Sequence, residues 1–370
     1  MNIGTVKEIK RHEYRVGLTP HCVQRYVSHG HEVFVEAGAG EGTGYSDDAY
    51  RDVGATILGV REEVFARADM IVKVKEPQPD EVPLFRVGQI LYTYLHLAAA
   101  PELAQALLDR RVKGVAYETI EDANGHLPCL KPMSEIAGRL SVQEGAKYLE
   151  RPSGGRGVLL GGVPGVRRGR ITILGAGTVG INACKMAVGI GADVTILDIS
   201  AERLAYLDDI FGARINTLYS TPANLDAAVA EADLVIGAVL IPGESAPKLI
   251  TRARLRLMKP GSVIVDVAVD QGGCCETTHP TTHDDPVFCE EGVVHYCVAN
   301  MPGVVALTST LALTSTTLDY GLAIADLGLE EACRRSPVLA RGVNTYDGHC
   351  VHEGVASSLG LAYTCMKDLL

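Results

Sequence analysis

The sequence predicts an α/β fold of two Rossmann-like, doubly wound domains, one of them inserted into the other. The chain has 370 residues, which is more than a single compact core usually organises. Apolar runs rich in β-branched residues alternate with helix-like segments in two separate series. A glycine-rich turn joins a strand-like run to a helix-like segment at the start of the second series.

The first series occupies residues 1–130 and predicts a parallel sheet with helical crossovers. Helix-like segments are expected at residues 20–28 and 101–110, the second opening on Pro101, a residue favoured at the first helical position. Beyond the opening strand-like run, the expected strands are residues 32–36, 69–74, 89–95 and 112–119.

The second series occupies residues 131–303 and contains enough strands for a complete doubly wound sheet. The remaining segment, residues 304–370, is mostly helical and is expected to return to the first domain. Its long apolar stretch is interrupted by Ser, Thr and Asp319, which favours a buried helix over a membrane span. The expected strands of the second series are residues 171–174, 193–197, 214–219, 234–238, 263–267 and 293–298.

Residues 175–180 read G-A-G-T-V-G and lie between an apolar run and a helix-like segment. In such a turn, Gly175 permits the sharp bend, Gly177 lets a pyrophosphate approach the backbone, and Gly180 allows the helix to pack closely on the strand. The helix start then offers unpaired N–H groups to phosphates. Asp198 follows at the spacing of an acid that binds a ribose 2′-hydroxyl, so the pattern predicts a dinucleotide site.

The same acid favours NAD over NADP, because a carboxylate repels a 2′-phosphate. Arg203 lies nearby and weakens this preference, since an arginine can pair with such a phosphate. Ligands of open α/β sheets bind beyond the carboxyl ends of strands, so Val239, Leu240 and residues 267–270 are expected to line the site.

The charge of the chain excludes several classes of partner. Acidic residues outnumber basic ones by 45 to 34, for a net charge of −11, which disfavours binding to nucleic acid or an anionic membrane. The opening run shows no signal-peptide pattern, and the ten cysteines include no C-x-x-C pair, so we expect a cytoplasmic protein. The spacing of Cys275, His279 and His283 resembles a metal pattern, but no second ligand cluster accompanies it and we expect no metal.

Four ionisable residues stand at or just after the ends of predicted strands, where active sites of this fold class are built. They are Arg15, Lys75, His96 and Asp270. Each also has a common structural explanation: an arginine is often solvated, a histidine is often structural, and Lys75 could pair with its neighbouring glutamate. Taken alone, these residues indicate an NAD-dependent oxidoreductase of unspecified substrate.

Along nearly its whole length the chain resembles the L-alanine dehydrogenase family. The resemblance implies interconversion of L-alanine with pyruvate and ammonia, and assembly as a homohexamer. It rests on several blocks in the same order, namely residues 4–8, 15–20, 72–77, 94–98, 132–139, 161–166, 266–273 and 298–302.

The resemblance also implies roles for the four residues. Arg15 and Lys75 would bind the substrate carboxylate, which a guanidinium can grip through two hydrogen bonds. His96 and Asp270 would be catalytic. His96 would act as the base when water adds to the iminium left after hydride transfer, and Asp270 would stabilise cationic intermediates.

Further contacts to NAD are implied along the second domain. The chain departs from the family at His279, where members usually carry an arginine near the adenosine, and at Ala306 and Leu307, where they carry a proline and a basic residue. Besides the glycines, the implied cofactor residues are Ser134, Thr178, Val179, Asp198, Arg203, Ser220, Val239, Leu240, Val267, Ala268, Val269, Asp270, His279, Val298 and Met301.

Three alternatives remain open from the sequence. The nucleotide-binding subunit of a proton-translocating transhydrogenase resembles the same domains, and would need a membrane partner rather than an alanine pocket. A non-catalytic NAD-binding regulator would tolerate loss of the four ionisable residues. A dehydrogenase of another amino acid, such as a lysine or saccharopine enzyme, would require extra polar groups for a longer side chain.

Overall fold

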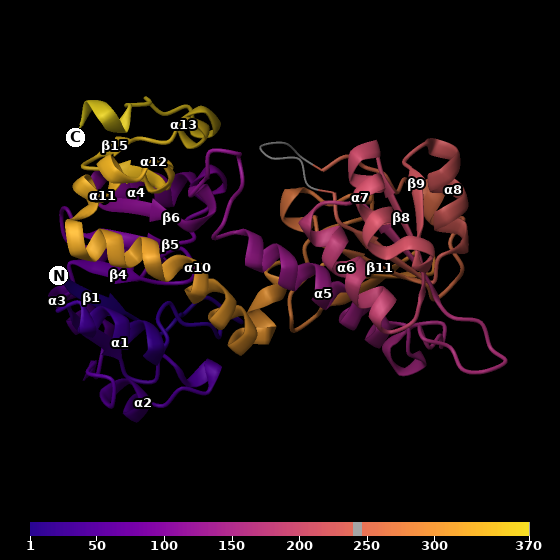
Figure 1. Cartoon of the computed structure of the whole chain (residues 1–370), viewed down its shortest axis with the longest axis horizontal. Helices are drawn as coiled ribbons and strands as arrows, with labels where there is room; N and C mark the ends of the chain where they lie inside the picture. Colours follow the sequence, from indigo (N-terminus) through magenta and orange to yellow (C-terminus); the bar gives the residue numbers. More distant parts are fainter. Residues whose placement is uncertain (240–245, 370) are drawn as a thin grey trace. The chain divides into compact units, whose positions relative to one another are not determined.

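The computed structural model describes residues 1–239 and 246–369 (Figure 1). It divides into two compact units. One consists of Met1–Met133 and Gly303–Leu370, and the other of Ser134–Pro302. The first unit is therefore built from both ends of the chain, and the second from its middle.

An eight-stranded sheet forms the centre of the first unit, in the order β15-β14-β6-β5-β4-β1-β2-β3. Strands β1 to β6 are parallel to one another. Read from β3 towards β6, they follow the spatial order 3-2-1-4-5-6 of a doubly wound sheet. The bounds are β1 (Asn2–Thr5), β2 (Glu32–Glu36), β3 (Thr56–Leu58), β4 (Met70–Val72), β5 (Ile90–Thr93), β6 (Lys113–Ala116), β14 (Val343–Tyr346) and β15 (His349–Cys350).

Strands β14 and β15 lie in the segment that the sequence predicts as mostly helical. β14 pairs antiparallel with β6, and Thr345 Oγ1 fixes the pairing because it accepts from the Gly114 N–H (3.0 Å) and donates to the Val112 carbonyl (2.9 Å). The pairing of β14 and β15 depends on an edge of the sheet, β6, that is formed by residues far away in the chain.

Helices of the first unit are α1 (Pro20–Ser28), α2 (Asp47–Arg51), α3 (Arg61–Arg67), α4 (Pro101–Asp109), α10 (Ala306–Leu327), α11 (Leu329–Arg335), α12 (Pro337–Arg341) and α13 (Glu353–Leu359). α1 begins as expected, because the Thr19 side chain accepts from the Cys22 N–H and Pro20 occupies the first turn. Figure 1 shows the C-terminal helix α10 beside the N-terminal strands, where Tyr92 donates to the Thr317 carbonyl (2.9 Å).

Within the described residues, the helical stretch Met301–Leu327 is the one long and apolar enough to cross a membrane. Of the most apolar 18 residues of this stretch, 56% are buried in the structure. Ser309, Thr310 and Thr317 are among its buried side chains, and an added Cβ at Gly321 would lie 2.2 Å from the Tyr26 hydroxyl. Such close packing against the unit is what a core helix of a folded domain requires.

The second unit contains a seven-stranded sheet in the order β12-β13-β11-β10-β7-β8-β9. Its six parallel strands again follow the order 3-2-1-4-5-6, which confirms the predicted class of two Rossmann-like sheets. The antiparallel edge strand β12 was not predicted. The bounds are β7 (Arg170–Leu174), β8 (Asp193–Asp198), β9 (Asn216–Tyr219), β10 (Leu234–Gly237), β11 (Val263–Asp266), β12 (Val287–Glu290) and β13 (Val293–Tyr296).

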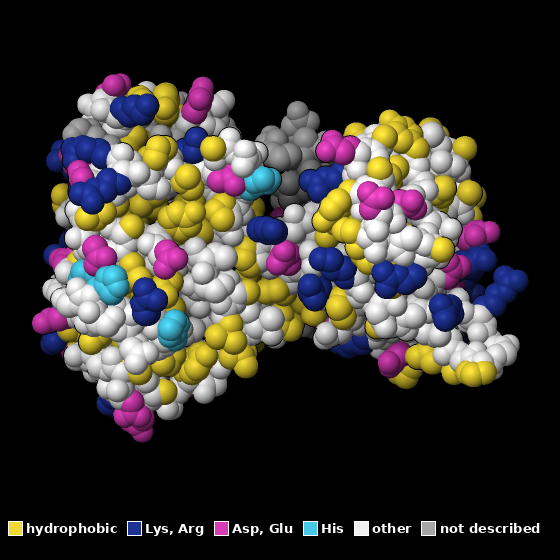
Figure 2. Space-filling model, in the orientation of Figure 1, with side chains coloured by type: hydrophobic (Ala, Val, Ile, Leu, Met, Phe, Trp, Pro, Cys, Tyr) yellow, Lys and Arg dark blue, Asp and Glu magenta, His cyan; other side chains and the backbone are white. Residues whose placement is uncertain are grey.

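Helices of the second unit cover this sheet, and apolar side chains from both layers form its core. The helix bounds are α5 (Lys131–Tyr148), α6 (Thr178–Gly189), α7 (Ala201–Phe211), α8 (Pro222–Glu231) and α9 (Arg252–Leu255). Figure 2 shows acidic, basic and apolar side chains interspersed on the visible face of each unit.

Candidate active site

Three of the predicted substrate and catalytic residues come together in the first unit. Arg15, Lys75 and His96 follow β1, β4 and β5, and these strands are neighbours in the sheet. Because parallel strands end at the same edge, the three residues share the carboxyl edge of the sheet. The charge of Arg15 contributes to lowering the pKa of Lys75, which places the two cations close enough to interact.

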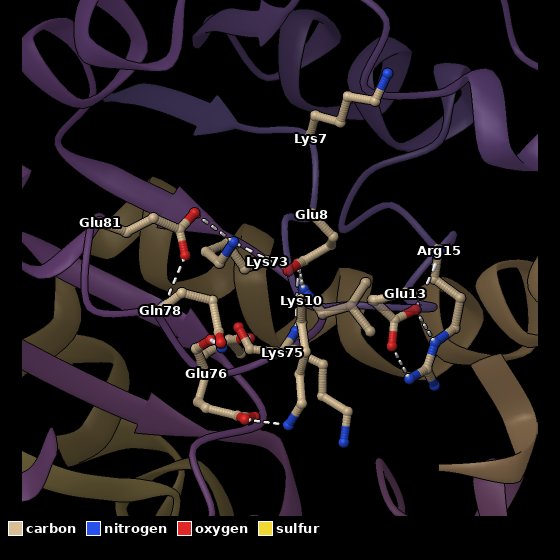
Figure 3. Close-up of polar contacts among 12 residues, drawn as sticks. Lys7, Glu8, Lys10, Glu13, Arg15, Lys73, Lys75, Glu76, Gln78 and Glu81 are labelled. Atoms are coloured by element: carbon tan, nitrogen blue, oxygen red, sulfur yellow. Dashed lines mark hydrogen bonds and ion pairs between the residues drawn. The ribbon is translucent and has the colours of Figure 1, made fainter. Parts of the chain in front are cut away.

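Arg15 is 2% exposed and is held by Glu13 (Figure 3). Its Nε donates to Glu13 Oε1 and its Nη2 to Oε2, both at 2.6 Å, and Nη1 lies 3.1 Å from the Met133 sulfur. Burial lowers the pKa of Arg15, but the hydrogen bonds and charge of Glu13 outweigh burial and raise it, so the guanidinium stays charged. Glu13 thus pairs with the Nε and Nη2 edge of the guanidinium.

Lys75 is fixed through its backbone rather than through its ammonium group. Its N–H donates to Glu8 Oε1 (3.2 Å), and its carbonyl accepts from Thr93 Oγ1 (3.0 Å). Among the described residues, the Lys75 ammonium forms no hydrogen bond or ion pair. Burial lowers its pKa, and the charge of Arg15 lowers it further. A bound anion would stabilise both cations.

His96 has a left-handed backbone, with φ of 50°, and its side chain is 45% exposed. This conformation is uncommon for a non-glycine residue and is held by Glu118, which accepts the His96 N–H at 2.6 Å and the Leu95 N–H at 3.1 Å. The ring stacks on Tyr94, with centroids 5.8 Å apart, and its Nδ1 lies 3.9 Å from Glu118 Oε1. The strained turn therefore presents an exposed imidazole next to a carboxylate.

In the second unit, the glycine turn has the geometry that a pyrophosphate requires. Gly175 has φ of 99°, a conformation that L side chains rarely adopt, and an added Cβ at Gly180 would lie 1.9 Å from the Gly175 oxygen. At Gly177 an added Cβ would meet no atom within 4 Å, so the backbone borders open space. Helix α6 begins at Thr178, directly after this turn. The turn fits a dinucleotide phosphate.

Asp198 ends β8 beside this turn. Its Oδ2 accepts the Ala176 N–H (2.6 Å) and its Oδ1 accepts the Ser200 N–H (2.8 Å), so the carboxylate is fixed at the strand end. Ser200 caps α7 by accepting the Arg203 N–H, which places Arg203 in the first turn of that helix. The acid and the arginine weighed in the cofactor prediction therefore lie on either side of the short loop between β8 and α7.

Most other predicted cofactor residues follow the carboxyl ends of parallel strands. Ser220 follows β9, Val239 follows β10, residues 267–270 follow β11, and Val298 follows β13. Ser134 lies on α5, Val179 lies in the first turn of α6, and Met301 opens the turn η8 (Met301–Val305). Leu240 lies outside the described residues.

Asp270 lies in the turn η7 (Val269–Gln271), where it is exposed. Asp266, the last residue of β11, holds this loop: its Oδ1 accepts the Ala268 N–H (3.2 Å), and its Oδ2 accepts the Cys274 N–H (2.8 Å) and the Thr278 hydroxyl (2.6 Å). The loop that carries the predicted catalytic acid is therefore anchored at both ends.

The residues with metal-like spacing are engaged in other contacts. Cys275 Sγ lies 3.0 Å from the Thr277 hydroxyl, and the His279 ring stacks on Phe288 with centroids 3.9 Å apart. Within residues 1–239 and 246–369, no group of three or more His, Cys, Asp or Glu residues is arranged to hold a metal ion.

One cavity, of about 660 Å³, lies away from all of these residues. It is at the amino-terminal ends of β7 and β8, opposite the glycine turn, and Arg170 and Arg214 are among its lining residues. The Arg170 guanidinium pairs with Glu231 (2.7 Å), and Arg214 donates to the Phe211 carbonyl (3.0 Å). Arg170 thus forms an ion pair with a nearby acid, and Arg214 forms a hydrogen bond with a carbonyl at the end of a helix.

Three carboxylates that support the site were missed by sequence interpretation: Glu8, Glu13 and Glu118. Each lies close to the end of a first-unit strand, which was the signal used for Arg15, Lys75 and His96. That signal does not distinguish an acid that binds a neighbouring side chain from a solvated one, because the partner is defined only in three dimensions.

Comparisons with known proteins agree with this geometry. Residues 4–137 match the family model "Alanine dehydrogenase/PNT, N-terminal domain", and residues 141–353 match the corresponding C-terminal domain. The chain is 56% identical to alanine dehydrogenase from Bacillus subtilis, over 100% of this chain and 98% of that protein. It is 54% identical to alanine dehydrogenase from Methanococcus maripaludis, over the full length of both.

Solved structures give the same result. An L-alanine dehydrogenase superimposes with a TM-score of 0.95 at 52% identity, covering 97% of this chain and 99% of that chain. A transhydrogenase from Sinorhizobium meliloti superimposes with a TM-score of 0.82 at 26% identity, covering 95% and 99%. Because both family models together match most of the chain and relatives exceed 50% identity over its full length, the chain belongs to the alanine dehydrogenase/PNT family.

Proposed function

We propose that this chain catalyses the reversible NAD-dependent oxidative deamination of L-alanine to pyruvate and ammonia. Membership of the family makes it an oxidoreductase with a dinucleotide site. The observation that carries the choice of substrate is the pair of cations at the carboxyl edge of the first sheet, the buried Arg15 and the partly buried Lys75. The transhydrogenase alternative gives no reason for two cations suited to a small carboxylate.

Arg15 and Lys75 bind the substrate carboxylate in this proposal. Glu13 holds the Nε and Nη2 edge of the guanidinium, and the substrate carboxylate meets the Arg15 guanidinium together with the Lys75 ammonium. The carboxylate thereby restores charge balance to a buried group whose pKa burial has lowered. This arrangement selects small α-carboxylates and places the substrate amine and Cα on the opposite side.

His96 is the proposed general base. After oxidation of the substrate to the iminium, His96 takes a proton from water as the oxygen adds to Cα, and the resulting carbinolamine collapses to pyruvate and ammonia. Glu118 Oε1 lies 3.9 Å from the Nδ1 of this base. Asp270 is the second proposed catalytic residue, and its carboxylate stabilises the cationic intermediates.

The second unit is the proposed NAD domain. The turn at residues 175–180 would hold the pyrophosphate, and Asp198 would accept hydrogen bonds from the adenosine ribose. Bound NAD supplies the hydride acceptor for alanine oxidation and, as NADH, the donor for the reverse reaction. The other proposed cofactor contacts are the strand-end residues described above, with His279 at the adenosine.

The test is an NADH absorbance assay with a panel of L-amino acids and with NAD and NADP. The expected result is that L-alanine with NAD is the best pair. Turnover with a longer amino acid but not with alanine would overturn the substrate assignment, and no turnover with any amino acid would favour a non-catalytic role.

Because the pKa of Lys75 is lowered, we expect the affinity for a carboxylate ligand to decline at a lower pH than an ordinary lysine would give. Only the ammonium form binds a carboxylate, so affinity is present below the pKa of Lys75 and is lost as the pH rises through it. Because that pKa is below the ordinary lysine value, the loss begins at lower pH than for an exposed lysine. The measurement is the inhibition constant of oxamate, a non-reacting pyruvate analogue, as a function of pH.

A Lys75→Arg variant is the control for this pH dependence, since arginine stays charged throughout the range. Oxamate binding by the variant is expected to lose its alkaline decline while keeping measurable affinity. The same decline in the variant would show that another group titrates.

An Asp198→Asn variant is expected to lose discrimination between NAD and NADP. Removal of the negative charge relieves repulsion of a 2′-phosphate and weakens the ribose hydrogen bonds, so kcat/KM for NAD should fall about 10- to 100-fold. The ratio of kcat/KM for NADP to that for NAD is expected to rise. Asp193→Asn, at the amino end of the same strand, is the matched control and should leave the ratio unchanged.

We further propose a cytoplasmic homohexamer. All ten cysteines lie in the described part of the chain and are free thiols, which suits a reducing compartment. Sedimentation of the purified chain tests the hexamer, and a monomer at micromolar concentration would contradict it.

A further inference from the structure

Two lysines after β4 have opposite environments although only one residue separates them. Lys73 is fully buried between two carboxylates, with Nζ 3.0 Å from Glu8 Oε2 and 2.8 Å from Glu81 Oε1 (Figure 3). Burial lowers the pKa of Lys73, but the two carboxylates outweigh burial and raise it. Within the part of the chain that the structure describes, the Lys75 ammonium has no such partner. The proposed mechanism uses Lys75 and leaves its buried neighbour Lys73 unexplained.

Glu8 connects the two lysines. Its Oε1 accepts the Val74 N–H (2.6 Å) and the Lys75 N–H (3.2 Å), while its Oε2 pairs with the Lys73 ammonium. One carboxylate therefore holds three consecutive residues. On the other side, the carbonyl of Lys73 accepts from the Tyr117 hydroxyl (3.0 Å), so the backbone that leads to Lys75 is fixed from two directions.

A buried ion-pair triad is a weak source of stability, because desolvation of the charges offsets most of their attraction. Glu8, Lys73 and Glu81 are each at most 8% exposed, and apolar residues of the same size would fill this space at comparable stability. Their direct connection to the Lys75 backbone gives them a role that apolar residues could not perform.

We propose that Glu8 is a positioning residue for Lys75: it fixes residues 73–75, and Lys73 occupies its second oxygen so that the Lys75 ammonium remains available to the substrate carboxylate. This inference rests on the proposed substrate-binding role of Lys75. The charged groups that act on the Lys75 ammonium are Arg15, Glu76, Lys10 and Glu13, and Lys10 forms an ion pair with Glu76. Glu8 therefore acts through the backbone and not through its charge on Lys75.

The first test is Glu8→Gln, which keeps the shape of the side chain but cannot accept from two N–H groups and balance Lys73 at once. We expect the KM for pyruvate to rise at least about 10-fold, since about 1.4 kcal/mol of lost binding corresponds to that factor. The KM for NADH should stay within about twofold, because the proposed NAD residues lie on the other unit. An unchanged KM for pyruvate would overturn the proposal.

The second readout is the titration of Lys75 itself, followed by ¹³C NMR after reductive methylation and assigned by the signal missing in Lys75→Arg. In Glu8→Gln the released backbone should let the ammonium reach solvent, so the pKa of Lys75 should rise toward the ordinary lysine value. An unchanged titration would contradict the positioning role. This readout needs no turnover, so it tests Glu8 even where the wild-type chain shows no activity with alanine, a result that would instead overturn the proposed function.

Glu36→Gln is the matched control. Glu36 is 8% exposed, as Glu8 is, and its carboxylate also accepts a backbone N–H, that of Lys7 at 2.8 Å. The Glu36→Gln variant should have altered stability but an unchanged KM for pyruvate. An equal increase of this KM in Glu36→Gln and Glu8→Gln would show a general structural effect. Where Glu8→Gln fails to fold, Glu8→Asp retains the charge on a shorter arm and should raise the KM for pyruvate at least about threefold. A wild-type KM in that variant would overturn the proposal.

Discussion

A His96→Asn variant is expected to lose about 10³-fold in kcat for alanine oxidation while it binds NADH normally, because removal of a general base typically costs 10²- to 10⁴-fold. Asparagine suits this position because it tolerates the left-handed backbone that Glu118 holds, so the fold is preserved. It cannot accept a proton from water at neutral pH. The measurements are kcat by NADH absorbance and the NADH dissociation constant by fluorescence titration.

His126→Asn is the control for this prediction. His126 is also exposed and lies 2.9 Å from a carboxylate, that of Asp122, but it is on a loop without any of the proposed site residues. Turnover of the His126→Asn variant should equal that of the wild type. Near-normal turnover of His96→Asn would exclude His96 as the base and leave the solvent or Asp270 as the proton acceptor.

An Arg15→Met variant is expected to lose both substrate binding and stability. The charge-assisted hydrogen bonds to the substrate carboxylate are worth about 1.5–3 kcal/mol each, so kcat/KM for pyruvate should fall at least about 10²-fold. The buried Glu13 carboxylate would also lose the guanidinium charge that pairs with it, and breaking a buried ion pair typically costs about 3–5 kcal/mol of unfolding free energy. Steady-state kinetics and urea unfolding measure the two effects separately.

The double variant Glu13→Gln/Arg15→Met separates binding from folding. Removing both charges avoids a buried carboxylate without the balancing guanidinium charge, so the double variant should regain much of the lost stability. It should not regain pyruvate binding, because the guanidinium is still absent. Recovery of kcat/KM together with stability would show that Arg15 supports the fold and does not contact the substrate.

The predicted fold was confirmed where apolar runs and helices alternate, and was incomplete at the edges of the two sheets. Six strands of the second sheet and the order of a doubly wound domain followed from alternating apolar runs and helices. The edge strands β3, β12 and β15, and β14 beside β15, did not, because each takes its place from a neighbour that is already in the sheet. The 3₁₀ turn η7 that carries Asp270 was likewise visible only as the residues after a strand.

The candidate site was predictable as a set of strand ends, but its internal partners were not. Arg15, Lys75 and His96 could be named because each follows an apolar run, and the neighbouring positions of β1, β4 and β5 bring them to one edge. Nothing in the sequence pairs Arg15 with Glu13 rather than with solvent. Likewise, the sequence left open a pairing of Lys75 with Glu76, whereas Glu76 pairs with Lys10.

The sequence by itself determined the dinucleotide turn and its acid, because Gly175, Gly177, Gly180 and Asp198 act within one contiguous strand–turn–helix–strand unit whose geometry is set locally. The tertiary structure alone decided which lysine is paired and which is available. Glu8 and Lys73 are 65 residues apart in the chain and meet only because β1 and β4 are adjacent in the sheet. Burial then fixes their charges, since a buried carboxylate and ammonium are stable only with a partner, and that partner is chosen by strand order.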